Sequence, residues 1–183
     1  MRTGEILQRF KAKDGREVIL RVPRWEDLDD LLDFINSLAE EDLEVLPELK
    51  KMTRDEEADW LAKRLAEIEK GKVINIVAEV EGKVVANSQV KLLSEPSGHV
   101  GVLGITVRSG YRETGIGTQM INVLAEESRK ANMKILILYT FEGNKRAIHV
   151  YEKCGFKETG RIPKGICRKG RYVDEIIMTK QLS

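Results

Sequence analysis

The sequence predicts an α+β protein with a mixed, mostly antiparallel twisted sheet of about seven strands and helices on both of its faces. Short apolar runs alternate with turn signals such as Asp14-Gly15 and Glu81-Gly82, which indicates strands joined in hairpins. Longer segments carry apolar residues at helical spacing. Because strands, helices and further strands follow one another along the chain, the helices are expected to cover the sheet.

Local signals define each element. Asp14-Gly15 favours a tight turn, and Thr53 followed by Glu56 is typical of a capped helix N-terminus. Gly71 is expected to end that helix. The expected strands cover residues 6–10, 17–22, 73–80, 84–93, 99–107, 134–141, 156–162 and 171–180, and the expected helices cover residues 25–41, 53–69, 118–132 and 144–154.

Size and composition restrict the function classes. The chain has 183 residues, 42% hydrophobic and 33% charged, so we expect one soluble domain over residues 1–183. The net charge of +1 provides no field for nucleic acid, and no apolar run is long enough to span a membrane. The N-terminus lacks the apolar core of a signal peptide, and Cys154 and Cys167 form no C-x-x-C pair. We therefore expect reduced thiols, a cytoplasmic location and no metal site.

A glycine-rich segment, Arg112-Glu-Thr-Gly115-Ile-Gly117-Thr118, lies between the strand-like run 102–107 and the helix-like run 119–132. A helix N-terminus leaves its first amides unpaired, and its dipole favours an anion there. The two glycines let the main chain approach a ligand closely. The segment is therefore interpreted as a cradle for a pyrophosphate, to which Arg112 adds a charge-assisted bond.

Three types of phosphate loop share parts of this pattern. The segment from Gly110 has Walker spacing, but Ile116 stands where the phosphate-binding lysine belongs. The dinucleotide fingerprint would need glycine or alanine at Met120, and it belongs to the first strand–helix unit of a fold. The third pattern, R/Q-x-x-G-x-G/A, is matched in full by Arg112 and the two loop glycines.

A second motif follows this loop: Asn144-Lys-Arg-Ala147-Ile-His-Val-Tyr151-Glu-Lys-Cys-Gly155-Phe156. Together the two segments resemble the GNAT superfamily of acetyl-CoA-dependent N-acetyltransferases, whose second pattern is N-x-x-A-x-x-x-Y-x-x-x-G-F. The resemblance covers roughly residues 17–180, and the closing segment 170–178 is similar to members near the ribosomal-protein-alanine and phosphinothricin-type acetyltransferases. It implies the GNAT fold, with the central strands 100–107 and 134–141 splayed apart.

The resemblance also implies that acetyl-CoA is the co-substrate and that a primary amine is the acceptor. The pantetheine arm would enter the gap between the splayed strands, and a backbone N–H near Ile105 or Val107 would polarise the thioester carbonyl. The cofactor-binding positions that match the family are Ile105, Thr106, Val107, Arg112, Glu113, Thr114, Gly115, Ile116, Gly117, Thr118, Asn144, Ala147 and Tyr151.

Tyr151 is the expected general acid, with packing alone as its alternative role. A leaving thiolate with a pKa near 8.5 departs more easily when a phenol held close delivers a proton. Asn144, Ala147 and Tyr151 stand at i, i+3 and i+7, so they share one helix face. His149 lies elsewhere around this helix and is expected to be a surface or core residue. Asn144 is also expected to cap the helix.

The general base is left open. Glu41 and Glu44 lie between the first two helices, in a segment that family members use to line the acceptor site. Glu142 ends the strand beside the gap, and His99 is a weaker candidate. Each carboxylate has a solvated surface position as its alternative, and water can relay the proton.

Two charge clusters and the cysteines have open roles. The acidic residues in 40–48 either attract a cationic amine or form a solvated helix end. The basic residues in 161–171 either contact an acidic substrate or the terminal phosphate of the cofactor, or form an exposed turn. Cys154 and Cys167 have no recognisable base partner, so direct transfer in a ternary complex is preferred to an acyl-enzyme.

The expected function is acetyl transfer from acetyl-CoA to a small-molecule amine or to a protein N-terminus. The alternative is a non-catalytic acyl-CoA-binding sensor of the same fold, in which Tyr151 serves only for packing. The resemblance favours a homodimer and leaves the acceptor open.

Overall fold

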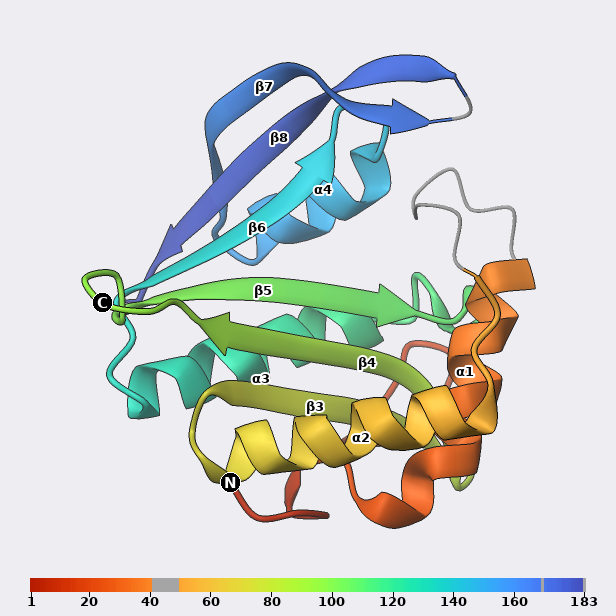
Figure 1. Cartoon of the computed structure of the whole chain (residues 1–183). Coiled ribbons are helices and arrows are strands. Elements are labelled where there is room, and N and C mark those ends of the chain that lie inside the picture. Colours follow the sequence, from red (N-terminus) through yellow and green to blue (C-terminus); the bar gives the residue numbers. More distant parts are fainter. Residues whose placement is uncertain (41–49, 169, 183) are drawn as a thin grey trace.

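A computed structural model describes residues 1–40, 50–168 and 170–182, which contain one sheet of eight strands (Figure 1). The strands lie in the order β1-β2-β3-β4-β5-β6-β8-β7. The α+β class is confirmed, and the described residues hold eight strands in place of about seven. Their bounds are β1 Ile6–Lys11, β2 Glu17–Arg21, β3 Val73–Val80, β4 Lys83–Leu92, β5 Val100–Val107, β6 Ile135–Phe141, β7 Lys157–Arg168 and β8 Arg171–Gln181.

The sheet is antiparallel except at its centre, where β5 and β6 run parallel. The two strands pair only between residues 100–102 and 135–137. Beyond these residues β5 stays paired with β4 as far as Val107, and β6 stays paired with β8 as far as Phe141 (Figure 1). Because each strand follows its outer neighbour, the two separate toward their C-terminal ends. The expected splayed pair is therefore confirmed.

Four α-helices in the described part of the chain cover the sheet: α1 Leu28–Glu40, α2 Arg54–Glu69, α3 Ile116–Lys130 and α4 Lys145–Lys153. α1 and α2 lie on one face, and α3 and α4 lie on the other (Figure 1). Under α3, an apolar cluster that includes Met120, Leu124 and Leu136 is sealed from solvent. On the opposite face, Leu61 of α2 packs with Val77 and with residues of α1. These two layers hold β3 and β4 between them.

Several element boundaries differ from the sequence expectation. The first expected helix opens with a 3-10 turn, Trp25–Asp27, before α1. α3 begins at Ile116, two residues early, because Gly115 has a φ of +92° and turns the chain directly into the helix. β7 runs past residue 162 to Arg168, since two irregularities in its register let it follow β8 further. The capping box at Thr53 is confirmed.

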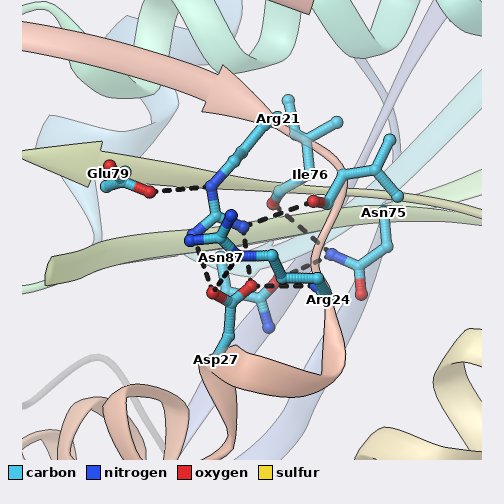
Figure 2. Close-up of polar contacts among 8 residues, drawn as sticks. Arg21, Arg24, Asp27, Asn75, Ile76, Glu79 and Asn87 are labelled. Atoms are coloured by element: carbon cyan, nitrogen blue, oxygen red, sulfur yellow. Dashed lines mark hydrogen bonds and ion pairs between the residues drawn. The ribbon is translucent and has the colours of Figure 1, made fainter. Parts of the chain in front are cut away.

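A buried ion cluster ties the start of α1 to the sheet (Figure 2). The Arg21 guanidinium donates to the two Asp27 carboxylate oxygens at 2.6 and 2.7 Å and to Glu79 Oε2 at 2.8 Å. Arg21 and Asp27 are 4% and 3% exposed. Asp27 Oδ2 also accepts the Arg24 N–H at 2.9 Å. Because each charge is paired and hydrogen-bonded, the cluster fixes where the chain leaves β2 for α1.

Candidate functional site

A pocket of about 440 Å³ opens between the C-terminal end of β5 and α4, and it is of a size that small ligands occupy. Its walls come from the end of β5, the glycine-rich loop with the start of α3, the inner side of α4, and the turn between β1 and β2. The lining residues are Lys13, Ile105, Thr106, Val107, Tyr111, Arg112, Glu113, Gly115, Gly117, Thr118, Ile121, Asn144, Arg146, Ala147, His149, Val150, Tyr151 and Lys153.

The glycine-rich loop presents free main-chain donors to this pocket. Within the described part of the chain, the N–H groups of residues 113–118 have no hydrogen-bond acceptor. The first pairing of α3 runs from the Gln119 N–H to the Gly115 carbonyl at 3.1 Å. Main-chain amides without acceptors can bind a ligand, and here they stand at the positive end of a helix dipole. The loop therefore fits a diphosphate, as its pattern predicts.

Two side chains hold the loop in place from below. Arg112 Nε donates to the Val107 carbonyl at 2.8 Å, which ties the loop to the end of β5 while the side chain stays at the pocket wall. Thr114 Oγ1 donates to the Tyr111 carbonyl at 2.7 Å. Thr114 and Ile116 are buried and do not line the pocket, unlike the other expected cofactor-binding positions. Their side chains support the loop, and only their main chain is available to a ligand.

The second motif forms the facing wall. Asn144, Ala147 and Tyr151 all line the pocket from α4, as their helical spacing predicts. Asn144 occupies the N-cap position, but its side chain makes no capping bond, so that expectation is wrong. Its Nδ2 donates to Thr140 Oγ1 of β6 at 3.2 Å. Asn144 is thereby fixed on the strand beside the gap.

Tyr151 lies at the inner end of this wall. Its ring meets Phe156 edge-on, with ring centroids 6.2 Å apart, and burial raises the pKa of its hydroxyl to about 12. Among the described residues, none accepts or donates a hydrogen bond at this hydroxyl. The phenol therefore keeps its proton at neutral pH and can present it to a group in the pocket.

Seven lining residues were not anticipated from the sequence: Lys13, Tyr111, Ile121, Arg146, His149, Val150 and Lys153. His149 is exposed but also reaches the pocket, because the cavity spans a broad arc of the short helix α4. Arg146, His149 and Lys153 follow i, i+3, i+7 spacing, so a second stripe of α4 was visible in the sequence. Lys13 left no such signal, because it reaches the pocket through a distant hairpin.

The candidates for a general base are dispersed. Glu142 is exposed and does not line the pocket; its Oε2 lies 3.7 Å from the Arg161 guanidinium. His99 is exposed and precedes β5, so it lies at the opposite end of that strand from Val107. Glu41 and Glu44 lie outside the described residues. The described structure thus brings no expected base to the pocket.

The charge clusters and cysteines also take definite positions. Arg161, in the basic hairpin, is surrounded by Glu142, Glu158 and Asp174, so its charge is already compensated. The acidic residues of 41–48 lie outside the described residues.

Burial raises the pKa of the Cys154 thiol, which disfavours a thiolate there, and Cys167 is exposed. Among the described residues, no group of three or more His, Cys, Asp or Glu side chains is placed to hold a metal ion.

The helices in the described part of the chain include none with the length and apolar character needed to cross a membrane.

Comparison with known proteins identifies one family and several curated relatives. A model of the Acetyltransferase (GNAT) family matches residues 32–156, which include the glycine-rich loop and the α4 motif. An L-methionine sulfoximine/L-methionine sulfone acetyltransferase of Pseudomonas paraeruginosa is 27% identical over 78 residues, which are 43% of this chain and 45% of that protein. The chain thus spans less than half the length of the curated relatives it matches in Pseudomonas.

Two solved structures are similar over most of the chain. The ribosomal-protein-alanine N-acetyltransferase from Brucella melitensis has a TM-score of 0.77 and 28% identity, covering 88% of this chain and 98% of its own. The protein yncA from Salmonella typhimurium, described as an acetyltransferase and solved with its cofactor acetyl-CoA, has a TM-score of 0.78 and 18% identity, covering 91% and 94%. At 18% identity the second similarity concerns the fold alone.

Proposed function

The chain belongs to the acetyltransferase (GNAT) family, and on that premise we propose that it transfers the acetyl group of acetyl-CoA to a primary amine. The observation that carries this proposal is the pocket between the end of β5 and α4, whose walls in the described part of the chain combine main-chain amides without acceptors and the half-buried Tyr151 phenol. Acetyl-CoA carries a diphosphate and a thioester joined by a pantetheine arm. Its binding therefore requires donors for the diphosphate and an acid near the thioester within one cavity.

Each wall has a chemical task in this proposal. The amides of residues 113–118 and the Arg112 guanidinium bind the diphosphate. The free edge of β5 near Ile105 and Val107 binds the extended arm as a neighbouring strand would, because β6 has left that edge. A main-chain N–H there stabilises the oxyanion that forms as the amine attacks, a contribution of about 3 kcal/mol in related cases.

Tyr151 completes the reaction as the acid. The amine attacks the thioester carbonyl directly, the C–S bond breaks, and the Tyr151 hydroxyl gives its proton to the departing sulfur. The amine gives up a proton to a base or to water. Glu41 and Glu44 remain the proposed bases, and Glu142, which does not line the pocket, acts only through a water relay. We prefer direct attack to an acyl-enzyme because Cys154 is buried with a raised pKa and does not line the pocket.

A thiol-release assay with acetyl-CoA and a panel of amines tests the reaction. The panel should include amino acids, polyamines and peptides with a free N-terminus, because the acceptor is proposed only as a small amine or a protein N-terminus. Amine-dependent release of free thiol is expected from at least one class. Tight binding of acetyl-CoA without release by any amine would instead support the sensor of the same fold.

Calorimetry tests the cradle separately from the chemistry. Arg112→Glu is expected to weaken coenzyme A binding by about tenfold or more, because it replaces a cation at the diphosphate with an anion. Lys91→Glu is a matched control, since Lys91 is exposed on β4 and lies outside the pocket. Unaltered affinity in Arg112→Glu would contradict the cradle.

We also propose that residues 1–183 act as one domain, in the cytoplasm, as a homodimer. The dimer is supported by large apolar side chains on the strands beyond the splay, where Tyr139, Ile162 and Tyr172 are 50%, 44% and 66% exposed. Light scattering tests the assembly. A monomer at concentrations well above those of the assay would contradict it.

A further inference from the structure

Three charged side chains stand at the mouth of the pocket and are not used by the proposed cradle. Lys13 lies in the turn between β1 and β2, Glu113 in the glycine-rich loop, and Arg146 in the first turn of α4. All three line the pocket and all three are exposed. We call them the rim cluster.

The turn that carries Lys13 is fastened to the glycine-rich loop. The Lys13 N–H donates to the Thr114 carbonyl at 2.9 Å, and Arg16 Nη2 donates to the Gly110 carbonyl at 2.9 Å. The Arg16 guanidinium also stacks over the Tyr111 ring, 4.1 Å from its centroid. These contacts hold Lys13 beside the loop, where its side chain passes Gly115. Among the described residues, no carboxylate pairs with the Lys13 ammonium.

Arg146 reaches the same part of the loop from the other side of the pocket. Its Nη2 lies 3.1 Å from Glu113 Oε1, with the two side chains 66% and 75% exposed. Water screens such a pair, so a ligand anion can replace the carboxylate at little cost. The Lys13 main chain is hydrogen-bonded to Thr114, and the Arg146 side chain is paired with Glu113. The two cations therefore flank one short stretch of the glycine-rich loop.

We propose that Lys13 and Arg146 form a second phosphate subsite, which binds the terminal 3′-phosphate of coenzyme A. The Glu113 carboxylate pairs with Arg146 until this phosphate displaces the carboxylate. The inference rests on the proposed function and adds to it a determinant of cofactor recognition. The Glu113 carboxylate is paired with Arg146, one of the two cations, and a bound phosphate replaces the carboxylate in this ion pair.

Charge and position favour the 3′-phosphate over the diphosphate. The diphosphate is served by the amides of residues 113–118 and by Arg112, which donates to the main chain within the pocket wall. The rim cations are more exposed and supply two positive charges, which match a phosphomonoester carrying nearly two negative charges at neutral pH. The basic hairpin of 161–171 is less suited, because carboxylates already surround Arg161.

Calorimetry on the full chain with coenzyme A and with dephospho-coenzyme A, which lacks only the 3′-phosphate, tests the subsite. The wild type is expected to bind coenzyme A roughly tenfold more tightly than dephospho-coenzyme A. Lys13→Ala and Arg146→Ala should each weaken coenzyme A binding about three- to fivefold and leave dephospho-coenzyme A unchanged. Lys11→Ala is the matched control, because Lys11 is exposed on the same hairpin and lies outside the pocket.

Glu113→Gln is expected to change the affinity for coenzyme A in the opposite direction. Without the competing carboxylate, coenzyme A should bind about twofold more tightly, again with dephospho-coenzyme A unchanged. Equal losses for both ligands in Lys13→Ala and Arg146→Ala would overturn the assignment and place these cations on the diphosphate. Equal wild-type affinity for both ligands would overturn the subsite while leaving the proposed function intact. Failure of both ligands to bind the folded wild type would overturn the proposed function itself.

Discussion

The two parts of the sheet on either side of the splay are covered differently. β3 and β4 lie between α1 and α2 on one face and α3 on the other, and every residue of β3 but one is buried (Figure 1). In β6, β7 and β8, by contrast, the large side chains of Tyr139 and Ile162 remain exposed. The first part thus supplies a rigid base for the cradle. The second part presents side chains, Tyr151 and Arg146 among them, to the same pocket.

The ion pairs of the two parts differ in burial, and therefore in how much they contribute to the free energy of unfolding. Arg21, Asp27 and Glu79 form a cluster that is almost sealed from water (Figure 2). Arg161 has carboxylate partners at 3.1 and 3.3 Å, and its side chain is 40% exposed. A buried charge that loses its partner costs several kcal/mol, whereas an exposed pair contributes less than about 1 kcal/mol. Substitution of a buried charge in the first part should therefore lower stability more than substitution of an exposed charge in the second part.

The largest effect is expected when the buried cluster is broken. Asp27→Ala should lower the free energy of unfolding by about 3 to 5 kcal/mol, because Arg21 keeps its charge inside the protein with Glu79 as its remaining partner. Denaturant unfolding followed by circular dichroism measures this change. A loss below about 1 kcal/mol would mean that the buried and exposed networks do not differ as their burial suggests.

The next effect concerns Glu57, which faces inward from α2. This side chain is 4% exposed, and burial alone raises its pKa to about 7. The folded protein therefore holds this proton more tightly than the unfolded chain, so its stabilising contribution is present at low pH and is lost as pH rises through about 7. Glu57→Gln should leave stability near pH 4 unchanged and raise it at pH 8 by about 3 kcal/mol relative to the wild type.

Unfolding curves at both pH values check the Glu57 prediction. Asp59→Asn is the matched control, because Asp59 is exposed on the same helix. A Glu57→Gln variant whose advantage is the same at pH 4 and pH 8 would show that this carboxyl does not change its protonation on folding.

Tyr151→Phe tests the part beyond the splay. Turnover should fall by about 100-fold, or about 2.7 kcal/mol, because the acid is removed while the ring and its contact with Phe156 remain. The KM for acetyl-CoA and the free energy of unfolding should change little. Since the pKa of Tyr151 is about 12, its own ionisation should cause no loss of wild-type turnover between pH 6 and 9. Steady-state kinetics across this range measures both, and unchanged turnover would reject the acid role.

The smallest effect is expected at the exposed network. Arg161→Ala should lower the free energy of unfolding by less than about 1 kcal/mol, because water replaces the contacts with Glu158 and Asp174. The same denaturant series as for Asp27→Ala provides the measurement. A loss as large as that of Asp27→Ala would show that the hairpin of β7 and β8 contributes more to stability than its exposure indicates.

Much of the fold and part of the site could be predicted because their signals are local. The capping box of Thr53 and Glu56 and the left-handed turn at Gly115 depend on residues a few positions apart. The shared face of Asn144, Ala147 and Tyr151 follows from helix geometry once the helix is assigned. The cradle was predictable for the same reason, since a strand, a glycine-rich turn and a helix are consecutive in the chain.

Other features depend on which distant groups meet. Lys13 reaches the pocket because its turn docks on the loop around Thr114. Glu142 lies outside the pocket, with its Oε2 3.7 Å from the Arg161 guanidinium of β7. The Asn144 amide donates to the Thr140 hydroxyl of β6, and its side chain makes no capping bond to α4.

By itself, then, the amino-acid sequence determined the order of the elements, the glycine-rich turn between β5 and α3 and the face of α4 that carries Tyr151. These depend on backbone preferences and on side-chain spacing within one or two helical turns. Only the tertiary structure decided the depth of Glu57, the partners of Arg161 and the meeting of Lys13, Glu113 and Arg146 at the pocket mouth. Burial and pairing of charges depend on strand register and helix packing, which join residues that no local pattern relates.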